Sequence, residues 1–188
     1  QVDTTTTGLD LFGSDRAVVA MRVDGNLVDL QRELHDGAEV EPVEATSEDG
    51  LNIIRHSATH VMAQAVQQLY PEVNLGIGPF ITDGFYYDFG NIEPVTPEVL
   101  SELEKRMKRI VKENQRFVRR VTTEESAREE LADQPYKLEL IGTKGKGAEG
   151  ASVEVGGGEL TIYDNVRRNG EVAWKDLCRG PHVPSTKY

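Results

Sequence analysis

Residues 51–70, LNIIRHSATHVMAQAVQQLY, are the stretch that decides the fold of this chain. Apolar side chains recur there every three or four residues, which is typical of an amphipathic helix, and Pro71 is a signal that ends it. The predicted buried stripe consists of Leu51, Ile54, Ala58, Val61, Met62, Ala65 and Leu69. His56 and His60 flank that stripe and lie four residues apart, so the helix points both imidazoles into the same space.

A second pair with the same spacing lies near the other end of the chain, in Cys178-Arg179-Gly180-Pro181-His182. The two pairs together hold the only cysteine of the chain and three of its four histidines. Four such side chains suit a single tetrahedral metal. They equally suit a polar pocket for acid–base chemistry. The residues alone leave both kinds of site open.

The composition describes an ordinary globular protein. The 188 residues suffice for one large or two small domains, with 38% hydrophobic and 28% charged residues. No apolar run is long enough to span a bilayer, and no signal peptide is visible, so we expect no membrane contact. The first residue is not Met, which indicates a processed or truncated product. A lone cysteine fits a reducing compartment, and we therefore expect a cytoplasmic protein.

The positive charge of this acidic chain is unevenly spread. The net charge of −11 argues against wholesale wrapping of nucleic acid. Eight of the 21 Lys and Arg residues nevertheless lie between Lys105 and Arg120, in a stretch with helical periodicity that starts at Thr96-Pro97-Glu98. The periodic apolar residues are Leu100, Leu103, Met107, Ile110, Val111 and Phe117. This helix is either a solvated surface or a ridge that contacts phosphates.

Residues 1–47 predict a small α+β module. We expect strands at Val18–Arg22 and Leu27–Leu30 around an Asp24-Gly25 turn, a third strand at Glu39–Ala45, and at most a short helix at Gly8–Gly13. Ser47–Gly50 is the predicted linker to a second domain, residues 48–188.

The second domain is also predicted to be α+β, with an antiparallel sheet that carries helices. Its predicted strands are Gly84–Phe89, Tyr136–Ile141, Leu160–Tyr163 and Val172–Lys175. Thr122 and Glu125 form a capping box for a short helix through Leu131. Gly142–Gly158 contains seven of the 18 glycines and is the expected mobile loop.

Four motifs carry a resemblance to a known family. They are Arg55–His60, Gly76–Pro79, Asp83–Asp88 and Asp176–His182. Their order and spacing resemble the N-terminal editing domain of a bacterial-type threonyl-tRNA synthetase. Residues 1–47 resemble the TGS-type β-grasp module before it, lacking its first strands. The resemblance covers essentially the whole chain. No class II catalytic motif follows, which implies that ligation, ATP, Mg, the catalytic zinc and the homodimer interface belong to missing domains.

The resemblance implies hydrolysis of the seryl ester on threonine tRNA. A synthetic site for threonine rejects serine poorly, because one methyl group is worth only about 1–3 kcal/mol. A second, tighter site admits serine and excludes threonine. The acceptor end of the tRNA is the implied partner, and Lys108, Lys112 and Arg116 are the candidates for contact with it.

Site residues follow from the resemblance position by position. His56 and His60 match the paired editing histidines, although which of them takes the proton stays open. Lys137 matches the lysine that orients water or stabilises the oxyanion, and Asp176 matches the group that binds the α-ammonium. Gly78 and Tyr87 match positions that line the pocket. Cys178 and His182 complete the site.

The metal is where the motif and the resemblance disagree. Three histidines and one cysteine favour zinc at His56, His60, Cys178 and His182. The threonyl family is expected to work without metal in this pocket, whereas the related alanyl-type editing proteins use zinc. Four protein ligands would also leave no position for a substrate water. We therefore expect no metal or other cofactor in this fragment.

Two alternatives remain. One is a freestanding zinc-dependent hydrolase of the alanyl-tRNA editing type, against which the β-grasp module and the Gly84–Asp88 run speak. The other is a non-catalytic binding module stabilised by zinc. Stoichiometric zinc whose removal unfolds the domain would favour the binding module.

Overall fold

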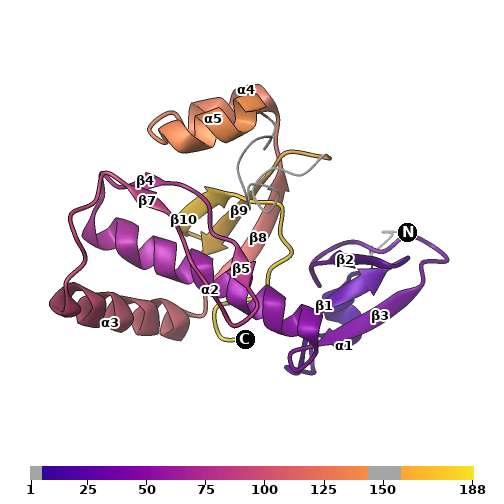
Figure 1. Cartoon of the computed structure of the whole chain (residues 1–188). Helices are drawn as coiled ribbons and strands as arrows, with labels where there is room; N and C mark the ends of the chain where they lie inside the picture. The colour runs from indigo at the N-terminus through magenta and orange to yellow at the C-terminus, as the bar shows by residue number, and fades with distance from the viewer. Residues whose placement is uncertain (1–5, 144–157) are drawn as a thin grey trace.

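The computed structural model describes residues 6–143 and 158–188. They form an α+β structure in which every sheet is antiparallel, which confirms the predicted fold class. A small amino-terminal module lies beside a larger body, and helix α2 extends from one to the other (Figure 1). The predicted mobile loop, Gly142–Gly158, lies outside the described residues apart from its ends. Among the described helices, none has the length and apolarity to cross a membrane.

The amino-terminal module matches the prediction closely. Its sheet has the order β2-β1-β3, and helix α1 (Gly8–Phe12) precedes it. The strands are β1 (Val18–Val23), β2 (Asn26–Val28) and β3 (Val40–Glu44). Asp24 and Gly25 have φ values of 50° and 80°, which is the left-handed pair that a tight hairpin turn requires.

Helix α2 (Glu48–Leu69) begins earlier than predicted. Ser47 caps it by accepting a hydrogen bond from the Gly50 N–H. The prediction of a linker at Ser47–Gly50 is therefore wrong, because these residues form the cap and the first turn of the helix. The helix ends before Pro71, as expected. The boundary between residues 47 and 48 stays a prediction.

The predicted stripe of α2 is largely buried, but it is only part of the buried surface of the helix. Val61 and Ala65 are buried, and Ile54, Met62 and Leu69 pack against the core. Leu51 is 41% exposed, whereas His56 and His60 are 3% and 1% exposed. The apolar periodicity marks the side of α2 that faces helix α3 (Pro97–Glu113), where Ile54 lines a shared cavity. The side that faces the sheet is buried as well, and its polar side chains have partners there, as Gln64 has in Asn165.

Two short two-stranded sheets replace the single aromatic strand predicted at Gly84–Phe89. β4 (Asn74–Leu75) pairs with β7 (Phe89–Gly90), and β5 (Phe80–Ile81) pairs with β6 (Gly84–Phe85). The break falls at Tyr87, which turns inward and is 7% exposed. Gly78 lies directly against this ring, where any Cβ would collide with it.

The basic stretch is a helix followed by a strand, so the prediction of one helix through Arg120 is wrong. Asn114, with φ 51°, ends α3 in a left-handed conformation. β8 (Arg116–Val121) then pairs with β9 (Thr161–Val166). The residues Phe117, Val118 and Val121 favour a strand, which accounts for the change.

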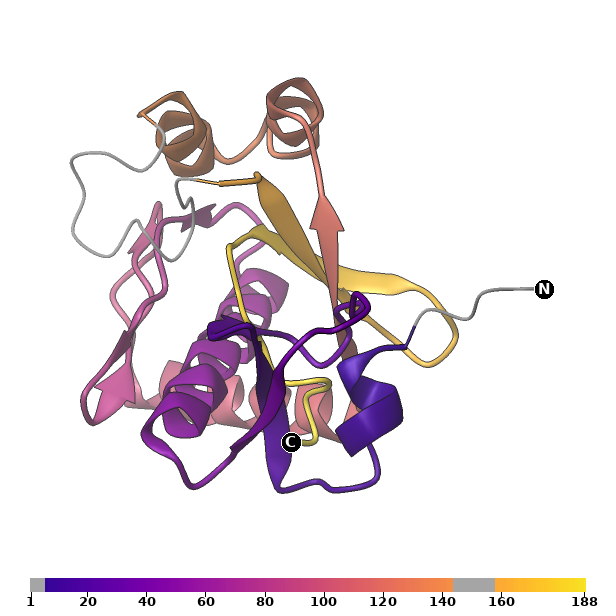
Figure 2. The ribbon, with the colours of Figure 1, turned by 90° about the vertical axis from the view of Figure 1, so that its right-hand side faces the viewer.

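The central sheet has the order β10-β9-β8, with β10 spanning Val172–Leu177. Helices α4 (Glu124–Glu130) and α5 (Pro135–Thr143) lie on the side of this sheet opposite α2 (Figure 2). The predicted strand at Tyr136–Ile141 is wrong, because Pro135 starts a helix there. Thr123, not Thr122, caps α4.

Candidate active site

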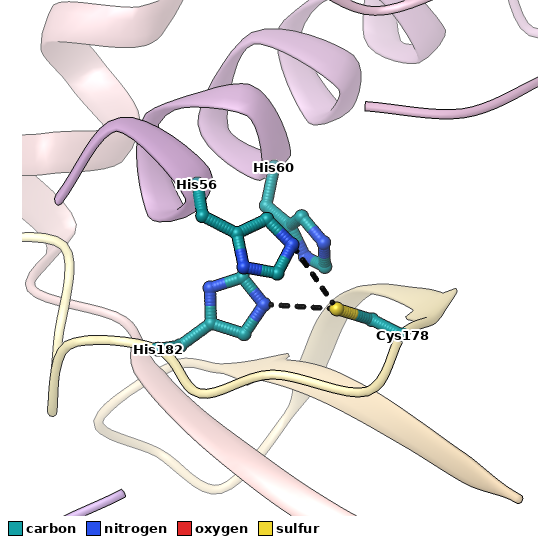
Figure 3. Close-up of side chains that lie close together, drawn as sticks. All are labelled: His56, His60, Cys178 and His182. Carbon is teal, nitrogen blue, oxygen red and sulfur yellow. Dashed lines mark hydrogen bonds between the residues drawn. The ribbon is translucent and has the colours of Figure 1, made fainter. Parts of the chain in front are cut away.

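Four side chains from the two sequence motifs meet between α2 and the central sheet. Their potential metal-ligating atoms all lie within 4.8 Å of one another. Figure 3 shows His56 and His60 descending from α2, Cys178 at the end of β10, and His182 in the loop that follows. The Cys178 Sγ lies 3.3 Å from the His56 Nε2 and 3.3 Å from the His182 Nε2. These residues could hold a metal ion.

The local backbone explains this convergence. His56 and His60 are one helical turn apart, and their ring centroids are 5.5 Å apart. Asp176 and Cys178 alternate with Leu177, so both face the same side at the end of β10. Gly180, with φ +71°, then turns the chain back, and its N–H donates to the Cys178 sulfur over 3.2 Å.

Burial keeps the three imidazoles neutral. It lowers the pKa of His56 to about 4. Burial, reinforced by the neighbouring imidazoles, lowers the pKa of His60 and of His182 well below 6.5. Each ring therefore keeps a nitrogen lone pair at neutral pH, which can accept a proton or bind a metal.

Hydrogen bonds fix the orientation of two of these rings. His56 bonds the backbone of Pro181, and because proline has no N–H, the His56 ring must donate to the carbonyl. The His56 Nε2 faces the sulfur, so this N–H is on Nδ1 and the lone pair is on Nε2. The His182 Nδ1 lies 3.0 Å from the Ser57 Oγ, which accepts a hydrogen bond from the Val183 N–H. The His60 Nδ1 has no partner among the described residues.

A second buried cluster is ionic. The Lys137 Nζ from α5 lies 3.0 Å from the Asp176 Oδ1, and the Tyr87 hydroxyl donates to the Asp176 Oδ2 over 2.6 Å. Lys137 and Asp176 are fully buried. Burial raises the pKa of Asp176, while the Lys137 charge and the Tyr87 hydrogen bond oppose that rise.

The two clusters are neighbours. Asp176 and Cys178 share one side of β10, and the Lys137 charge contributes to the lowered pKa of both His56 and His60. Gly78 lies between the ionic cluster and α2, since a Cβ there would meet both the Tyr87 ring and the Thr59 hydroxyl. The structure thus brings together the residues that the sequence analysis proposed as catalytic or substrate-binding.

The three residues proposed for tRNA contact occupy different surroundings. Lys108 and Lys112 are exposed on α3, and the Lys108 Nζ lies 2.6 Å from the Glu104 carboxylate. Arg116 is exposed on β8, not on the helix. Most cations of the basic stretch have acidic partners, namely Arg106, Lys108, Arg109, Arg119 and Arg120. Much of the local positive charge is therefore neutralised.

Sequence reasoning missed two residues that support the site. Ser57 lies between the paired histidines and orients the His182 ring. Asp29 belongs to the amino-terminal module, yet its carboxylate accepts hydrogen bonds from the His182 N–H and the Tyr163 hydroxyl, over 2.7 and 2.5 Å. The only sequence signal for Asp29 was a lone carboxylate inside an apolar run.

Comparison with known proteins gives a consistent result. No family model matches the sequence. A threonine--tRNA ligase of Streptomyces avermitilis is 63% identical over 99% of this chain, and that of Streptomyces griseus subsp. griseus is 62% identical over 100%. The Bifidobacterium longum threonine--tRNA ligase is 54% identical over the whole chain. The chain spans 29% of the length of the two Streptomyces proteins and 28% of the third. The chain is therefore similar over its whole length to threonine--tRNA ligases, and it corresponds to less than a third of the length of these relatives.

Proposed function

We propose that this chain hydrolyses the ester of mischarged seryl-tRNA(Thr), and so proofreads the product of threonine--tRNA ligation. The observation that carries the proposal is a buried cluster of neutral histidines beside a buried Lys–Asp pair. Ester hydrolysis needs a proton acceptor, a group that stabilises the oxyanion, and a group that holds the substrate. We assign ATP-dependent ligation to the part of the relatives that this chain does not match.

Proton transfer falls to the histidine cluster. A neutral imidazole can take a proton from the attacking water and return one to the leaving ribose oxygen. His56 and His60 are the candidates, since both keep a lone pair at neutral pH. His182 and Cys178 complete this polar wall.

Substrate binding falls to the ionic cluster. The Asp176 carboxylate is the group suited to the α-ammonium of the amino acid, and Lys137 is suited to orienting water or stabilising the oxyanion. Both oxygens of Asp176 already have partners, so the bound ammonium shares the carboxylate with Lys137 and Tyr87. The close packing of Gly78 on Tyr87 restricts the space, which supports exclusion of the larger threonine.

A cleft beside the cluster offers a way for the substrate to approach. It has a volume of about 720 Å³ and is lined by Arg55 and the β5–β6 hairpin, among others. The Phe80 ring in this lining has its centroid 6.5 Å from that of His56. The tRNA acceptor end is the proposed partner here.

The donor set would also fit zinc, and His56, His60, Cys178 and His182 would be the ligands. Bound there, zinc would supply a Lewis acid. We propose metal-free hydrolysis instead, because four protein ligands leave no open position for water. The second candidate function, a zinc-stabilised binding module, is favoured by the convergence of those four ligand atoms.

Deacylation of two esters tests the proposal. The chain is incubated without ATP with seryl-tRNA(Thr) and with threonyl-tRNA(Thr), at high protein concentration, and released amino acid is counted. We expect serine to be released and threonine to be spared. Equal cleavage of both esters would exclude the size sieve, and no cleavage of either would exclude editing.

A further inference from the structure

A carboxylate of the amino-terminal module reaches the loop that carries His182. Asp29 follows β2 and is 7% exposed. Its Oδ1 accepts a hydrogen bond from the main-chain N–H of His182 over 2.7 Å. Its Oδ2 accepts one from the Tyr163 hydroxyl over 2.5 Å. Each of its oxygens therefore holds a group outside the amino-terminal module.

These two groups flank the turn that joins Cys178 to His182. The Tyr163 hydroxyl lies against Gly180, where a Cβ would collide with it. The Tyr163 ring also meets the His182 ring edge to face, with centroids 4.6 Å apart. Asp29 thus holds the backbone of the turn directly at His182 and, through Tyr163, beside Gly180.

The His182 side chain is fixed by other residues. Ser57 bonds its Nδ1, and Phe117 stacks on its ring with centroids 4.9 Å apart. These contacts set the direction of the ring once the backbone is in place. The backbone is held at two neighbouring positions: the buried His182 N–H donates to Asp29, and the Val183 N–H donates to Ser57.

We propose that Asp29 is a positioning residue of the site, through which docking of the amino-terminal module sets the distance between His182 and Cys178. The effect of Asp29 on hydrolysis rests on the proposed function. Its effect on the distance between His182 and Cys178 does not. Asp29 touches neither the Cys178 sulfur nor the His56 and His60 rings in any described hydrogen bond, so it acts through His182 and Tyr163.

A second contact between module and body provides a matched control. Arg22 on β1 forms an ion pair with Asp49 in the first turn of α2, and both side chains are partly exposed. This pair joins the same two parts of the chain without touching the turn. If Asp29 served only to attach the module, loss of either contact would have similar effects.

The first experiment needs no substrate. The chain contains a single cysteine, so the rate of alkylation by iodoacetamide reports on Cys178 alone. We expect Asp29→Ala to speed alkylation several-fold in the folded protein, and Arg22→Ala to match wild type. Asp29→Asn keeps an acceptor for the His182 N–H and should restore most of the protection. Wild-type rates in Asp29→Ala, or equal acceleration in Arg22→Ala, would overturn the proposal.

The second experiment measures deacylation of seryl-tRNA(Thr). We expect Asp29→Ala to lower kcat by about 10–100-fold with little change in KM, because small displacements of a reacting group have effects of this size. Asp29→Asn should recover most of kcat, and Arg22→Ala should resemble wild type. A change in KM alone would contradict positioning.

Two further outcomes keep the tests separate. If wild type does not deacylate, the proposed function fails, and alkylation still decides whether Asp29 positions the turn. If Asp29→Ala does not fold, Tyr163→Phe replaces it. Tyr163→Phe removes one of the two donors to Asp29 and should then accelerate alkylation less than loss of both. Unchanged alkylation in Tyr163→Phe would then overturn the proposal.

Discussion

The two buried clusters beside β10 avoid an unpaired buried charge in opposite ways. The histidine cluster avoids buried charge, because burial lowers the pKa of each imidazole until it is neutral. The ionic cluster keeps its charges and pairs them, with Lys137 3.0 Å from Asp176. Neutral groups suit proton exchange, whereas fixed charges suit the binding of a charged substrate. The contrast predicts that the two clusters fail differently when they are altered.

Loss of a histidine should have the largest effect on catalysis. We expect His56→Ala or His60→Ala to lower deacylation of seryl-tRNA(Thr) by about 10²–10⁴-fold, the range for losing a positioned proton-transfer group. Since both rings are buried, each variant should also lose some stability, which urea unfolding measures alongside. His35→Ala is the control, because this exposed histidine pairs with Asp24 far from the cluster. A loss below tenfold in both site variants would contradict the assignment.

Loss of one ionic partner should have the largest effect on stability. Asp176→Ala removes the carboxylate that pairs with the buried Lys137 ammonium, at a cost of about 3–5 kcal/mol in the free energy of unfolding. The double variant Lys137→Met, Asp176→Leu should recover much of this loss in urea unfolding. A double variant no more stable than Asp176→Ala would contradict the pairing argument. In assays of folded protein, Asp176→Asn should chiefly raise KM, and Lys137→Met should chiefly lower kcat.

The neutral cluster should make stability depend on pH. The pKa of His56 falls from 6.5 to about 4 on folding, so the unfolded chain binds more protons between these values. The contribution of His56 to the free energy of unfolding is therefore fully present above about pH 7, and it is lost as the pH falls toward 4. From pH 7 to pH 5 the loss from His56 alone should be about 2 kcal/mol. His56→Gln should reduce the loss measured by urea unfolding, and an identical loss in that variant would contradict the assignment.

Chelation distinguishes the two chemical uses of the histidine cluster. We expect the chain to keep its fold and its deacylation activity after treatment with a chelator. Circular dichroism, elemental analysis and the seryl-tRNA(Thr) assay measure this. One tightly held zinc per chain, with activity lost on removal and restored by zinc, would favour the metal site over metal-free hydrolysis.

The basic surface should show the smallest effect. Replacing Lys108, Lys112 and Arg116 together by Ala should weaken tRNA binding and flatten its salt dependence, each lost phosphate contact changing the log–log slope by about 0.9. Arg128→Ala on α4 is the control, because it removes a cation paired with Glu124 elsewhere on the surface. Unchanged affinity and slope would make the Lys108–Arg116 surface an ordinary solvated one.

The sequence was most informative where local rules decide the outcome. The Asp24-Gly25 turn and the Pro71 helix end follow from backbone chemistry and are confirmed. The strand at Tyr136–Ile141 was wrongly predicted, because short apolar runs do not distinguish strand from helix. The burial of polar side chains on α2 was missed, because only partners on the sheet satisfy them, such as Asn165 for Gln64.

In the candidate site, too, local sequence patterns were informative and long-range contacts were not. The spacing of the two motifs was enough to propose that His56, His60, Cys178 and His182 belong together, and the resemblance added Lys137 and Asp176. Asp29 could not be found in this way, because its contact with His182 joins two modules far apart in sequence. Such contacts depend on how the modules dock, which no local pattern encodes.

The burial of the histidine cluster has a kinetic consequence. At most 3% of any of its three imidazoles is exposed, and Cys178 is not exposed at all. We infer that an ester reaches these groups only from conformers in which the cluster has opened. If about one molecule in a hundred is open, the apparent dissociation constant rises about a hundredfold. Hydrogen exchange of the His182 amide measures the open fraction. Immediate exchange would show that opening is not rare.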